Sequence, residues 1–587
     1  MLESLSSDDI GHFTQEVKKI DLATRKNVSN IFESLILSLD LRDNPEKSKY
    51  SLFGKQHPPF SFSVDDALNK LSNLRLDIEV KVARTTITYS MKQSLAFDLL
   101  KQFFEAKLIH YPNSRTETKL ERHGILQITP KGTAMVCAFC QSIGMSSKAI
   151  PSVVKSAFNS MELFILERSP VNHNILFSEY LVKMLFSWVM GPFPNVWSVD
   201  RQPDPISCVY YETGSDGEYD FFNADEHRSQ NGDGSTKESV ISPFHHRYFT
   251  NPESDSHVQY YVSNTGVRLF KQKVFLNNDK KVIVDYCVSG KAIVQWLCDC
   301  TSVRNAAEAV SIGDLFIERG LLRQITVDKQ RFSNDRNALY ILTEQGSVAC
   351  KWSAKTKRKN LTNNFPSLDI HPSRFSTSQF DGPTLKDIIK DPGLRILFKM
   401  HMQKERCVEN VDAYISLVNF GDSVQQVFKL HKYYQALEDG PRKSKVFNAI
   451  SFHMNNFFSK AFQLYSAYIS PDSQFDLNID YKLRQDAHRL LTFDGPLSPT
   501  IDHMMTPMTD KSFFGDQDLS QIAQPLTPPV DANHVIIESD LVKNVALVRD
   551  IHRVFLKIAD SIFRLMEIDS YPKFIKSDAF LDAVAHV

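Results

Sequence analysis

Glycine, cysteine and net charge are all scarce in this chain of 587 residues. Only 21 residues are glycine, which argues against Gly-rich fibrous and low-complexity proteins. The 68 Lys and Arg residues balance 69 Asp and Glu residues, and a net charge of -1 gives no overall attraction to nucleic acid, so no nucleic-acid partner is expected. Eight cysteines are few for this length and indicate a reducing compartment. By contrast, 42% of the residues are hydrophobic, which is enough for several buried cores.

Targeting and membrane-spanning segments are also missing from the sequence pattern. The first residues have neither the basic region nor the apolar region of a signal peptide. The most apolar stretch, 175–190, contains Glu179 and Lys183, and it is too short and too charged to cross a bilayer. We therefore expect a cytoplasmic protein whose recruitment to the plasma membrane is peripheral.

Sequence motifs of known catalytic chemistry do not occur where that chemistry would need them. There is no GxxxxGK[ST], HExxH or GxSxG string. Cys137 and Cys140 have C-x-x-C spacing, but no histidines stand at zinc-finger distance from them. Ordinary buried thiols explain this pair better than a metal site does. We expect no metal, no cofactor and no active site of the chain's own.

Shifts in composition divide the chain, whose length corresponds to about three or four domains at roughly 150 residues each. The predicted parts are an α+β unit at 1–145, a helical segment at 146–211, an acidic linker at 212–257, a second α+β unit at 258–352, a basic linker at 353–382 and a helical region at 383–585. Polar insertions interrupt the helical region at 419–445 and 494–540. The second insertion has six prolines and neither Tyr nor Trp, which predicts disorder.

Apolar residues recur at every third or fourth position of the helical region, as in bundle helices. Two such faces comprise Phe447, Ile450, Met454, Phe457, Ala461, Tyr465 and Tyr468, and Leu541, Val545, Val548, Ile551, Phe555, Ile558, Ile562 and Leu565. At the start of the region, Asp391 is suited to cap a helix that begins at Pro392, where the missing N–H costs nothing.

Three short polar clusters lie at the ends of these helical patterns. They are 409–410, 478–480, and Leu565 with 569–571. None contains a Cys/His or Ser/His pair or metal-ligand spacing, so together they predict a surface that binds another protein. Taken singly, Asn478 is equally well explained as a turn former and Asp569 as a helix-end cap.

The sequence around these clusters resembles the RGS domain, an all-helical module that accelerates GTP hydrolysis by heterotrimeric G-protein α (Gα) subunits. The matching strings are TLKDII at 384–389, VENVDAY at 408–414, LNID at 477–480 and MEIDSYPKF at 566–574. The unit at 258–352 resembles a DEP domain through SGKAIVQWL at 289–297 and IGDLFIERGLL at 312–322. The unit at 1–145 resembles a more diverged first DEP domain.

The chain as a whole is similar to fungal RGS proteins with tandem DEP domains, the regulators that desensitise pheromone signalling. The resemblance implies a multidomain fold in which two α+β winged-helix-like DEP domains precede an all-α RGS helical bundle with disordered insertions. It implies a GTPase activator of GTP-bound Gα that terminates receptor signalling and is not itself an enzyme. The alternative is a non-catalytic scaffold that links receptor tail, membrane and Gα without accelerating hydrolysis.

The resemblance also implies roles for single residues. Asn478 would hold the catalytic Gln of Gα, and a neutral amide suits this role because it donates and accepts hydrogen bonds without adding charge beside the phosphates. Glu409 and Asn410 would bind the other side of the same switch segment. The remaining predicted residues of the Gα-binding site are Glu405, Asp480, Arg484, Leu565, Asp569, Ser570 and Lys573, of which Asp480 and Arg484 would brace the loop of Asn478.

Departures from the family pattern concern the choice of partner. Lys573 stands where the family usually has Arg, so a single charge replaces a two-pronged contact. Ala413 and Tyr414 replace the usual Phe-Trp pair, and Cys407 replaces the common Ser.

Further partners are expected from the remaining segments. The resemblance implies that the DEP domains bind the cytoplasmic tail of a G-protein-coupled receptor. The basic linker is either a solvated connection or a contact with anionic lipid, worth about 1 kcal/mol for each basic residue. Ser498, Thr506 and Thr527 each precede proline, as in MAP-kinase sites, although chance accounts for such motifs in a Pro-rich loop equally well. Phosphate there would add about -2 charge without touching the bundle.

Overall fold

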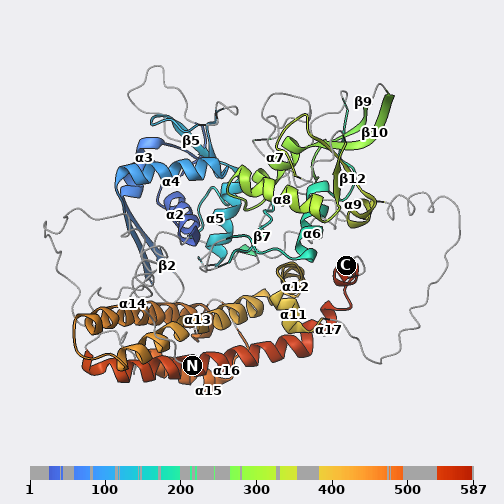
Figure 1. The fold of residues 1–587 in the computed structure, drawn as a ribbon. Helices are drawn as coiled ribbons and strands as arrows, with labels where there is room; N and C mark the ends of the chain where they lie inside the picture. The colour runs from blue at the N-terminus through green and yellow to red at the C-terminus, as the bar shows by residue number, and fades with distance from the viewer. Residues whose placement is uncertain are drawn as a thin grey trace, which may run out of the picture.

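The computed structural model describes residues 25–584 apart from 40, 44–57, 80–83, 113–116, 118, 143–144, 146–148, 170–173, 199–211, 214–218, 221–243, 245–264, 278–279, 326–330, 353–382, 472, 474, 476 and 493–537. The basic linker 353–382, nearly all of the acidic linker 212–257, and Ser498, Thr506 and Thr527 therefore lie outside the described residues. Figure 1 shows an α/β part, coloured blue to green, stacked on a helical part, coloured yellow to red.

The first α/β unit has a three-stranded sheet of order β1-β5-β4 and a separate β2–β3 hairpin. Its elements are α2 (Arg25–Ser38), β1 (Ser61–Ser63), α3 (Val64–Ser72), β2 (Asn73–Glu79), β3 (Arg84–Ser90), α4 (Gln93–Glu105), β4 (Ile109–His110), β5 (Ile125–Ile128) and α5 (Pro130–Ser142). β5 follows Gly124 directly, and α4 buries Leu99, Leu100, Phe103 and Phe104.

The second α/β unit has a five-stranded sheet of order β11-β12-β10-β9-β6. Its elements are α6 (Glu179–Met190), β6 (Val196–Trp197), β9 (Leu269–Asn277), β10 (Lys280–Ser289), α7 (Gly290–Cys300), α8 (Ala306–Glu318), β11 (Leu322–Gln324), β12 (Leu339–Leu342) and α9 (Glu344–Ala349). A further pair of strands, β7 (Glu212–Thr213) and β8 (Tyr219–Asp220), lies between β6 and β9 in sequence. β6 pairs parallel with β9, so the Pro-rich segment that precedes Val196 belongs to this sheet.

The two α/β units share one chain path. In each, a strand that ends in serine pairs antiparallel with a later strand: Ser63 opposes Ile125, and Ser289 opposes Leu339. In each, that serine side chain caps the following helix by accepting a hydrogen bond from the amide three residues on. The first unit inserts the β2–β3 hairpin before its next helix, whereas the second unit runs directly from α7 to α8.

The end of this path is repeated as well. The Thr129 hydroxyl accepts a hydrogen bond from the Gly132 amide at 3.0 Å, and Thr343 accepts one from Gly346 at 3.0 Å. A Cβ atom on Gly132 of α5 would lie 2.3 Å from a backbone oxygen, and one on Gly346 of α9 would lie 2.2 Å from a backbone oxygen. The last helix of each unit therefore packs too closely for any side chain at its glycine. The two units therefore match in local geometry as well as in element order.

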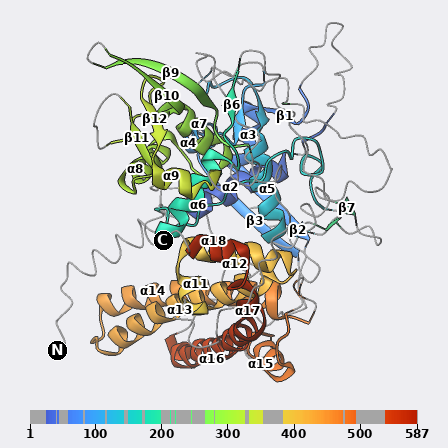
Figure 2. The ribbon, with the colours of Figure 1, turned by 90° about the vertical axis from the view of Figure 1, so that its right-hand side faces the viewer.

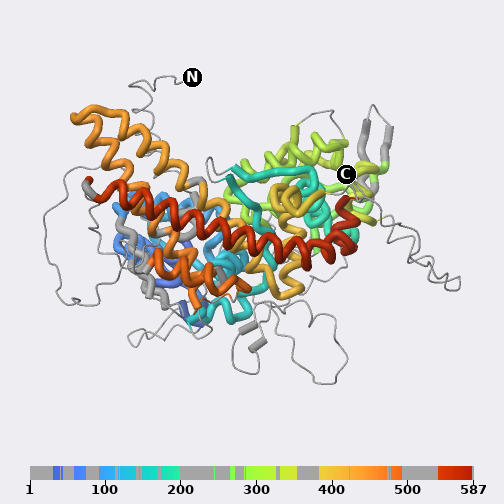
Figure 3. The backbone as a smooth tube through the Cα atoms, turned by 90° about the horizontal axis from the view of Figure 1, so that it is seen from below, coloured from blue at the N-terminus to red at the C-terminus, as the bar shows by residue number. Residues whose placement is uncertain are grey.

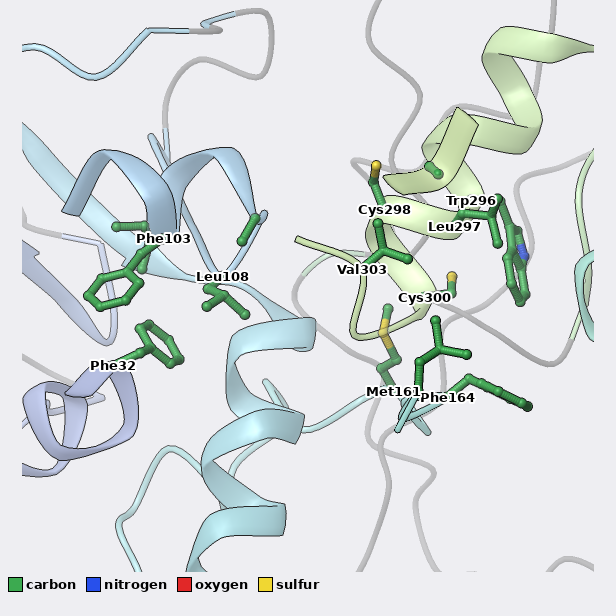
Figure 4. Packing of buried hydrophobic residues seen from close by; sticks show 14 of the residues in the cluster. Phe32, Phe103, Leu108, Met161, Phe164, Trp296, Leu297, Cys298, Cys300 and Val303 are labelled. Carbon is green, nitrogen blue, oxygen red and sulfur yellow. The ribbon is translucent and has the colours of Figure 1, made fainter. Parts of the chain in front are cut away.

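One apolar core runs through both α/β units. Figure 4 shows Phe32, Phe103 and Leu108 of the first unit, the connecting residues Met161 and Phe164, and Trp296 with Cys300 and Val303 of the second unit. The connecting segment also forms a parallel bridge between Phe164 and Thr301. The two units are thus packed into a single block.

The helical part has its own core. Its elements are α11 (Leu385–Lys390), α12 (Pro392–Lys404), α13 (Val408–Gln435), α14 (Pro441–Leu464), the π-helical turn η3 (Tyr465–Ile469), α15 (Tyr481–Thr492), the 3-10 turn η5 (Glu538–Asp540), α16 (Leu541–Leu565), the π-helical turn η6 (Met566–Ser570), α17 (Tyr571–Phe574) and α18 (Asp578–Val584). Phe420 meets Phe457 at 4.6 Å and Phe555 at 5.4 Å between ring centroids, so α13, α14 and α16 pack together.

Most of the predicted helical faces are confirmed. Ile450, Met454, Phe457 and Ala461 on α14 are fully buried, as are most of the predicted positions of α16. Asp391 caps α12 by accepting hydrogen bonds from the amides of the next turn at 2.8 and 2.9 Å. Residues 419–445, predicted as a partly helical insertion, form the later part of α13 and the start of α14. Figure 3 shows this hairpin reaching beyond the rest of the bundle.

Within the described ranges, no helix combines the length and the apolar character needed to cross a membrane.

Candidate functional site

The first predicted contact residues lie at the sharp junction between α12 and α13. Glu405 follows the last turn of α12, and Arg406 adopts a left-handed backbone conformation with φ 58°. Cys407 stands at the start of α13, and the Asn410 side chain donates to its carbonyl oxygen at 3.3 Å. A non-glycine residue in this conformation is strained, and such strain persists only where the surroundings fix it. The junction therefore presents Glu409 and Asn410 on a tightly held turn.

Lys573 joins this junction to the last predicted cluster. Its Nζ lies 2.9 Å from Asp569 Oδ1 and 3.5 Å from Glu405 Oε1. The hydrogen bond with Asp569, followed by the charge of Glu405, raises the pKa of Lys573. The ammonium thus bridges two carboxylates that are far apart in sequence. Among the described residues, Glu405 Oε2 is buried and has no hydrogen-bond partner.

The cluster around Asp569 is carried by the π-helical turn η6, which continues α16. Asp569 is exposed and Ser570 is buried, where it forms a hydrogen bond with the Cys407 thiol. Leu565 is 37% exposed and Ile568 is 77% exposed, so apolar side chains lie beside the carboxylate on the surface. π-helical turns occur frequently at functional sites, because the extra residue redirects side chains locally.

Asn478 lies in the loop before α15. Its neighbours Leu477 and Ile479 are buried, whereas Asn478 is exposed, and its side chain forms no hydrogen bond with any residue that the structure describes. Arg484 Nη2 donates to the Leu477 carbonyl at 2.9 Å, and Asp480 Oδ1 accepts from the Lys482 amide at 2.9 Å. Hydrogen bonds thus fix Leu477 and Asp480 on either side of Asn478, while the Asn478 side chain is bonded to no described residue.

The Asn478 loop is tied to α13 through Tyr468. This side chain stacks on Phe475 at 5.4 Å between ring centroids. It also forms a hydrogen bond with Ser416 and lies near Asp412, and burial raises its pKa to about 12. No hydrogen bond or ion pair within the described ranges joins Asn478 to Glu409 or Asp569. The structure thus joins Glu405 and Asp569 through Lys573, whereas the Asn478 loop contacts α13 through Tyr468.

Burial also affects the acidic residues of the site. Burial, followed by the nearby charge of Asp412, raises the pKa of the half-buried Glu409 carboxyl. Burial lowers the pKa of His401, which lies 3.7 Å from Glu405 Oε1. Glu405 and Asp569, by contrast, share the ammonium group of Lys573.

Large exposed side chains near the predicted residues were missed by the sequence reasoning. Tyr481, three residues after Asn478, is 78% exposed, and Ile568 precedes Asp569. The signal that could have found them is an aromatic or branched residue directly beside a polar residue at a helix end. Together they give the polar site an apolar border.

The thiols behave as packing residues. Cys137 and Cys140 are both buried, and burial raises the pKa of Cys140 to about 12. Its thiol therefore stays protonated at neutral pH. The part of the chain that the structure describes contains no group of three or more His, Cys, Asp or Glu side chains arranged to hold a metal ion.

Two family models match parts of the chain. Residues 27–156 match the fungal-differentiation regulator winged helix domain. Residues 266–342 match the domain found in Dishevelled, Egl-10 and Pleckstrin, the DEP domain. The chain is thus multidomain, with a winged-helix domain followed by a DEP domain, as predicted for the second α/β unit. The predicted bounds 258–352 of the DEP domain stay a prediction. The assignment of the first unit as a diverged DEP domain stays a prediction.

Two curated relatives extend the match beyond these domains. The chain is 23% identical over 578 residues to the developmental regulator flbA of Emericella nidulans, which covers 94% of this chain and 63% of that protein. It is 19% identical over 408 residues to regulator of G-protein signaling 1 of Schizosaccharomyces pombe, which covers 68% of this chain and 69% of that protein. The predicted resemblance to fungal RGS proteins is confirmed. The chain is a homologue of these fungal regulators, with a fungal-differentiation winged-helix domain followed by a DEP domain.

Proposed function

We propose that this chain is a GTPase activator of a heterotrimeric Gα subunit, and that residues 383–584 form its RGS bundle. The observation that carries the proposal is the Lys573 bridge. It holds Glu405 and Asp569 within ion-pair distance, on the same bundle as the exposed and unpartnered amide of Asn478. The relatedness to regulator of G-protein signaling 1 of Schizosaccharomyces pombe supports Gα as the partner.

The proposed mechanism leaves all covalent chemistry to Gα. A Gα subunit carries its own arginine and a Gln that orients the attacking water, yet it hydrolyses GTP at only about 10⁻² per second. A partner that binds the transition-state arrangement more tightly than the ground state lowers the barrier by that difference in binding. The chain would therefore act by holding the switch segments of Gα, and it would not be an enzyme in its own right.

The geometry of Asn478 suits this role. The buried Leu477 and Ile479 fix the loop, and the bond from Arg484 prevents it from opening. The side-chain amide would accept a hydrogen bond from the Gln side chain of Gα and donate one back to it. Because Leu477 and Ile479 are anchored in the core, residues 477–479 lose little conformational entropy on binding.

The part of the proposed surface around Asp569 combines a charged side chain with an apolar border. Asp569 is exposed and would accept backbone N–H groups of a switch segment. Leu565 and Ile568 would exclude water around it, as apolar neighbours do around central polar contacts of an interface.

Single-turnover GTP hydrolysis by a purified cognate Gα tests the proposal. We expect this protein to accelerate the reaction and Asn478→Ala to lose most of that acceleration. The matched control is Asn455→Ala, an exposed Asn of α14, which should behave as wild type. No acceleration by the wild-type protein would refute the proposal.

A scaffold that binds Gα without accelerating hydrolysis is the alternative. The two functions differ in their preference for the state of Gα. The activator should bind Gα loaded with GDP and aluminium fluoride, a transition-state mimic, more tightly than the GTP-bound form. A scaffold would bind both forms equally, and Asn478→Ala would leave its affinity unchanged.

We further propose that the α/β block recruits the protein to the plasma membrane. The tail of a G-protein-coupled receptor, in a pheromone-type pathway, is the proposed partner of the DEP domain, and anionic lipid is a partner of the basic segment 353–382. The repeated chain path supports the first unit as a diverged DEP domain. Removal of residues 1–360 should release a fluorescently tagged protein from the membrane into the cytoplasm, and unchanged recruitment would contradict this proposal.

Phosphorylation by a MAP kinase is the last element of the proposed function. Ser498, Thr506 and Thr527 lie in the long segment between α15 and α16. Phosphorylation there would add charge outside the helices and leave the bundle unchanged. Mass spectrometry after treatment with a MAP kinase should find phosphate on these residues, and its absence would contradict the assignment.

A further inference from the structure

Two adjacent residues of the segment between α5 and α6 bind opposite halves of the molecule. Arg168 donates from both terminal nitrogens to the two carboxylate oxygens of Glu308 on α8, at 2.8 Å each. Glu167 accepts from Arg395 Nε on α12 at 3.1 Å, with a second contact to Arg395 Nη2. Both pairs are largely buried, which strengthens charge-assisted hydrogen bonds. The pair Glu167–Arg168 therefore connects a DEP helix to a helix of the bundle.

The connection continues from α12 into α13. Lys399 Nζ lies 3.7 Å from Glu167 Oε1 and 2.9 Å from Asp412 Oδ1. Asp412 is one helical turn beyond Glu409 on the turn that the proposed function assigns to Gα binding. Ion pairs thus lead from Glu308 to Arg168 and from Glu167 through Lys399 to Asp412, and the backbone joins Arg168 to Glu167.

The surrounding interface holds this chain of charges in place. A Cβ atom on Gly393 would lie 2.3 Å from the Leu181 amide nitrogen, so α12 packs backbone to backbone on α6. Ser178 Oγ donates to Asp391 Oδ1 at 2.8 Å across the same contact. Figure 2 shows α6 at the lower edge of the α/β part, above and to the left of α12, with α18 next to α12. Glu167 therefore has little freedom to leave Arg395 and Lys399 while α6 and α12 remain packed.

We propose that Glu167 and Lys399 are positioning residues for Gα binding, through which the α/β block holds the turn that carries Glu409 and Asn410. This inference rests on the proposed function. Lys399 neutralises Asp412, which would otherwise repel the neighbouring carboxylate of Glu409, and Glu167 keeps Lys399 at this place. A ligand that moves α8 of the DEP domain would thereby shift the Gα-binding turn.

Loss of the charge of Lys399 or of Glu167 should weaken the binding of Gα for a physical reason in each case. Without Lys399, two carboxylates face each other on one helix turn, and burial together with Asp412 already raises the pKa of Glu409. Without the charge of Glu167, two cations of α12 lose their shared partner. In both cases the turn gains freedom that Gα must remove when it binds.

The experiment uses the full chain in single-turnover GTP hydrolysis with a cognate Gα. For Lys399→Gln and Glu167→Gln we expect the concentration for half-maximal acceleration to rise roughly two- to five-fold, as for a partly exposed ion pair. The maximal rate should not change, because Asn478 is untouched. Lys399→Arg should behave as wild type because it keeps a cation beside Asp412, and the double variant Lys399→Gln/Asp412→Asn should restore wild-type behaviour because it removes the carboxylate left unpaired.

Matched controls separate positioning from general destabilisation. Lys543→Gln removes the same charge from the exposed start of α16 and should have no effect. If Lys399→Gln equals wild type, or if adding Asp412→Asn fails to restore it, the inference is wrong although the proposed function stands.

A second measurement decides the inference if the wild-type protein does not accelerate hydrolysis, which would refute the proposed function. Amide hydrogen exchange in peptides from α12 and the first two turns of α13 should be faster in Glu167→Gln than in wild type. Exchange in α16 should be unchanged. Equal exchange of both proteins in α12 and α13 would overturn the positional coupling itself.

Discussion

Lys131 offers the clearest test of how the two α/β units are joined. It lies on α5, is fully buried, and its Nζ donates to the carbonyl oxygens of Cys298 at 2.7 Å and Val303 at 2.6 Å in the second unit. Burial lowers its pKa from 10.5 to about 8, against the opposing charges of Asp299 and Glu308. The shift of about 2.5 corresponds to about 3 kcal/mol at 1.36 kcal/mol per pKa unit.

The substitution Lys131→Met leaves two buried carbonyl groups without donors, at about 1–3 kcal/mol each, and relieves about 3 kcal/mol of charge burial. The net loss of unfolding free energy at pH 7 is on the order of 1 kcal/mol. The pH dependence of the unfolding free energy gives a sharper test than its value at pH 7. Between the folded pKa and the unfolded pKa, the unfolded chain binds the additional proton, so the stability of the wild-type protein rises with pH.

From pH 7 to pH 9 the wild-type protein should therefore gain about 1.4 kcal/mol relative to Lys131→Met. The neutral amine still has two N–H groups for the two carbonyl groups, so both bonds survive. All four tryptophans, Trp188, Trp197, Trp296 and Trp352, lie in or beside the second unit, and their fluorescence in urea reports its unfolding. Lys70→Met, at an exposed lysine of α3, is the control. Parallel stability curves for wild type and Lys131→Met would refute the reasoning.

Three further predictions concern backbone geometry and the Asn478 loop. Gly393→Ala should lower the thermal unfolding midpoint, despite a helix propensity gain of about 1 kcal/mol, because its Cβ would overlap Leu181; a higher midpoint would contradict the packing. Lys107→Gly should raise the unfolding free energy by about 1 kcal/mol, since Lys107 has φ 62°, and no gain in urea titration would contradict this. Arg484→Ala should reduce GTPase acceleration roughly ten-fold by freeing Leu477 and its loop, with far-ultraviolet circular dichroism unchanged; full activity would show that the brace is dispensable.

Local features of the fold followed from the sequence. Apolar periodicity located α14 and α16, and the Asp391-Pro392 pair located the start of α12, because caps and buried faces are set by neighbouring residues. The later part of α13 was harder to predict. Its polar residues suggested an interruption, but polar side chains on an exposed helix face do not break the helix.

Features that depend on distant residues could not be predicted. Lys573 was predicted as a Gα-binding residue that departs from the family pattern, but its bridge between Asp569 and Glu405 arises from the packing of η6 beside α12. Glu167 carried no signal at all, because its partner Arg395 is 228 positions away. The repeated path of the two α/β units likewise became visible only in strand pairing and caps.

The most direct test of the central proposal compares wild type and Asn478→Ala in single-turnover GTP hydrolysis by the cognate Gα. The proposal predicts strong acceleration by wild type, at least a ten-fold loss for Asn478→Ala, roughly 1.4 kcal/mol of transition-state stabilisation, and normal activity for Asn455→Ala. Equal acceleration by wild type and Asn478→Ala would contradict the role of this residue, and no acceleration by either would contradict the proposed function.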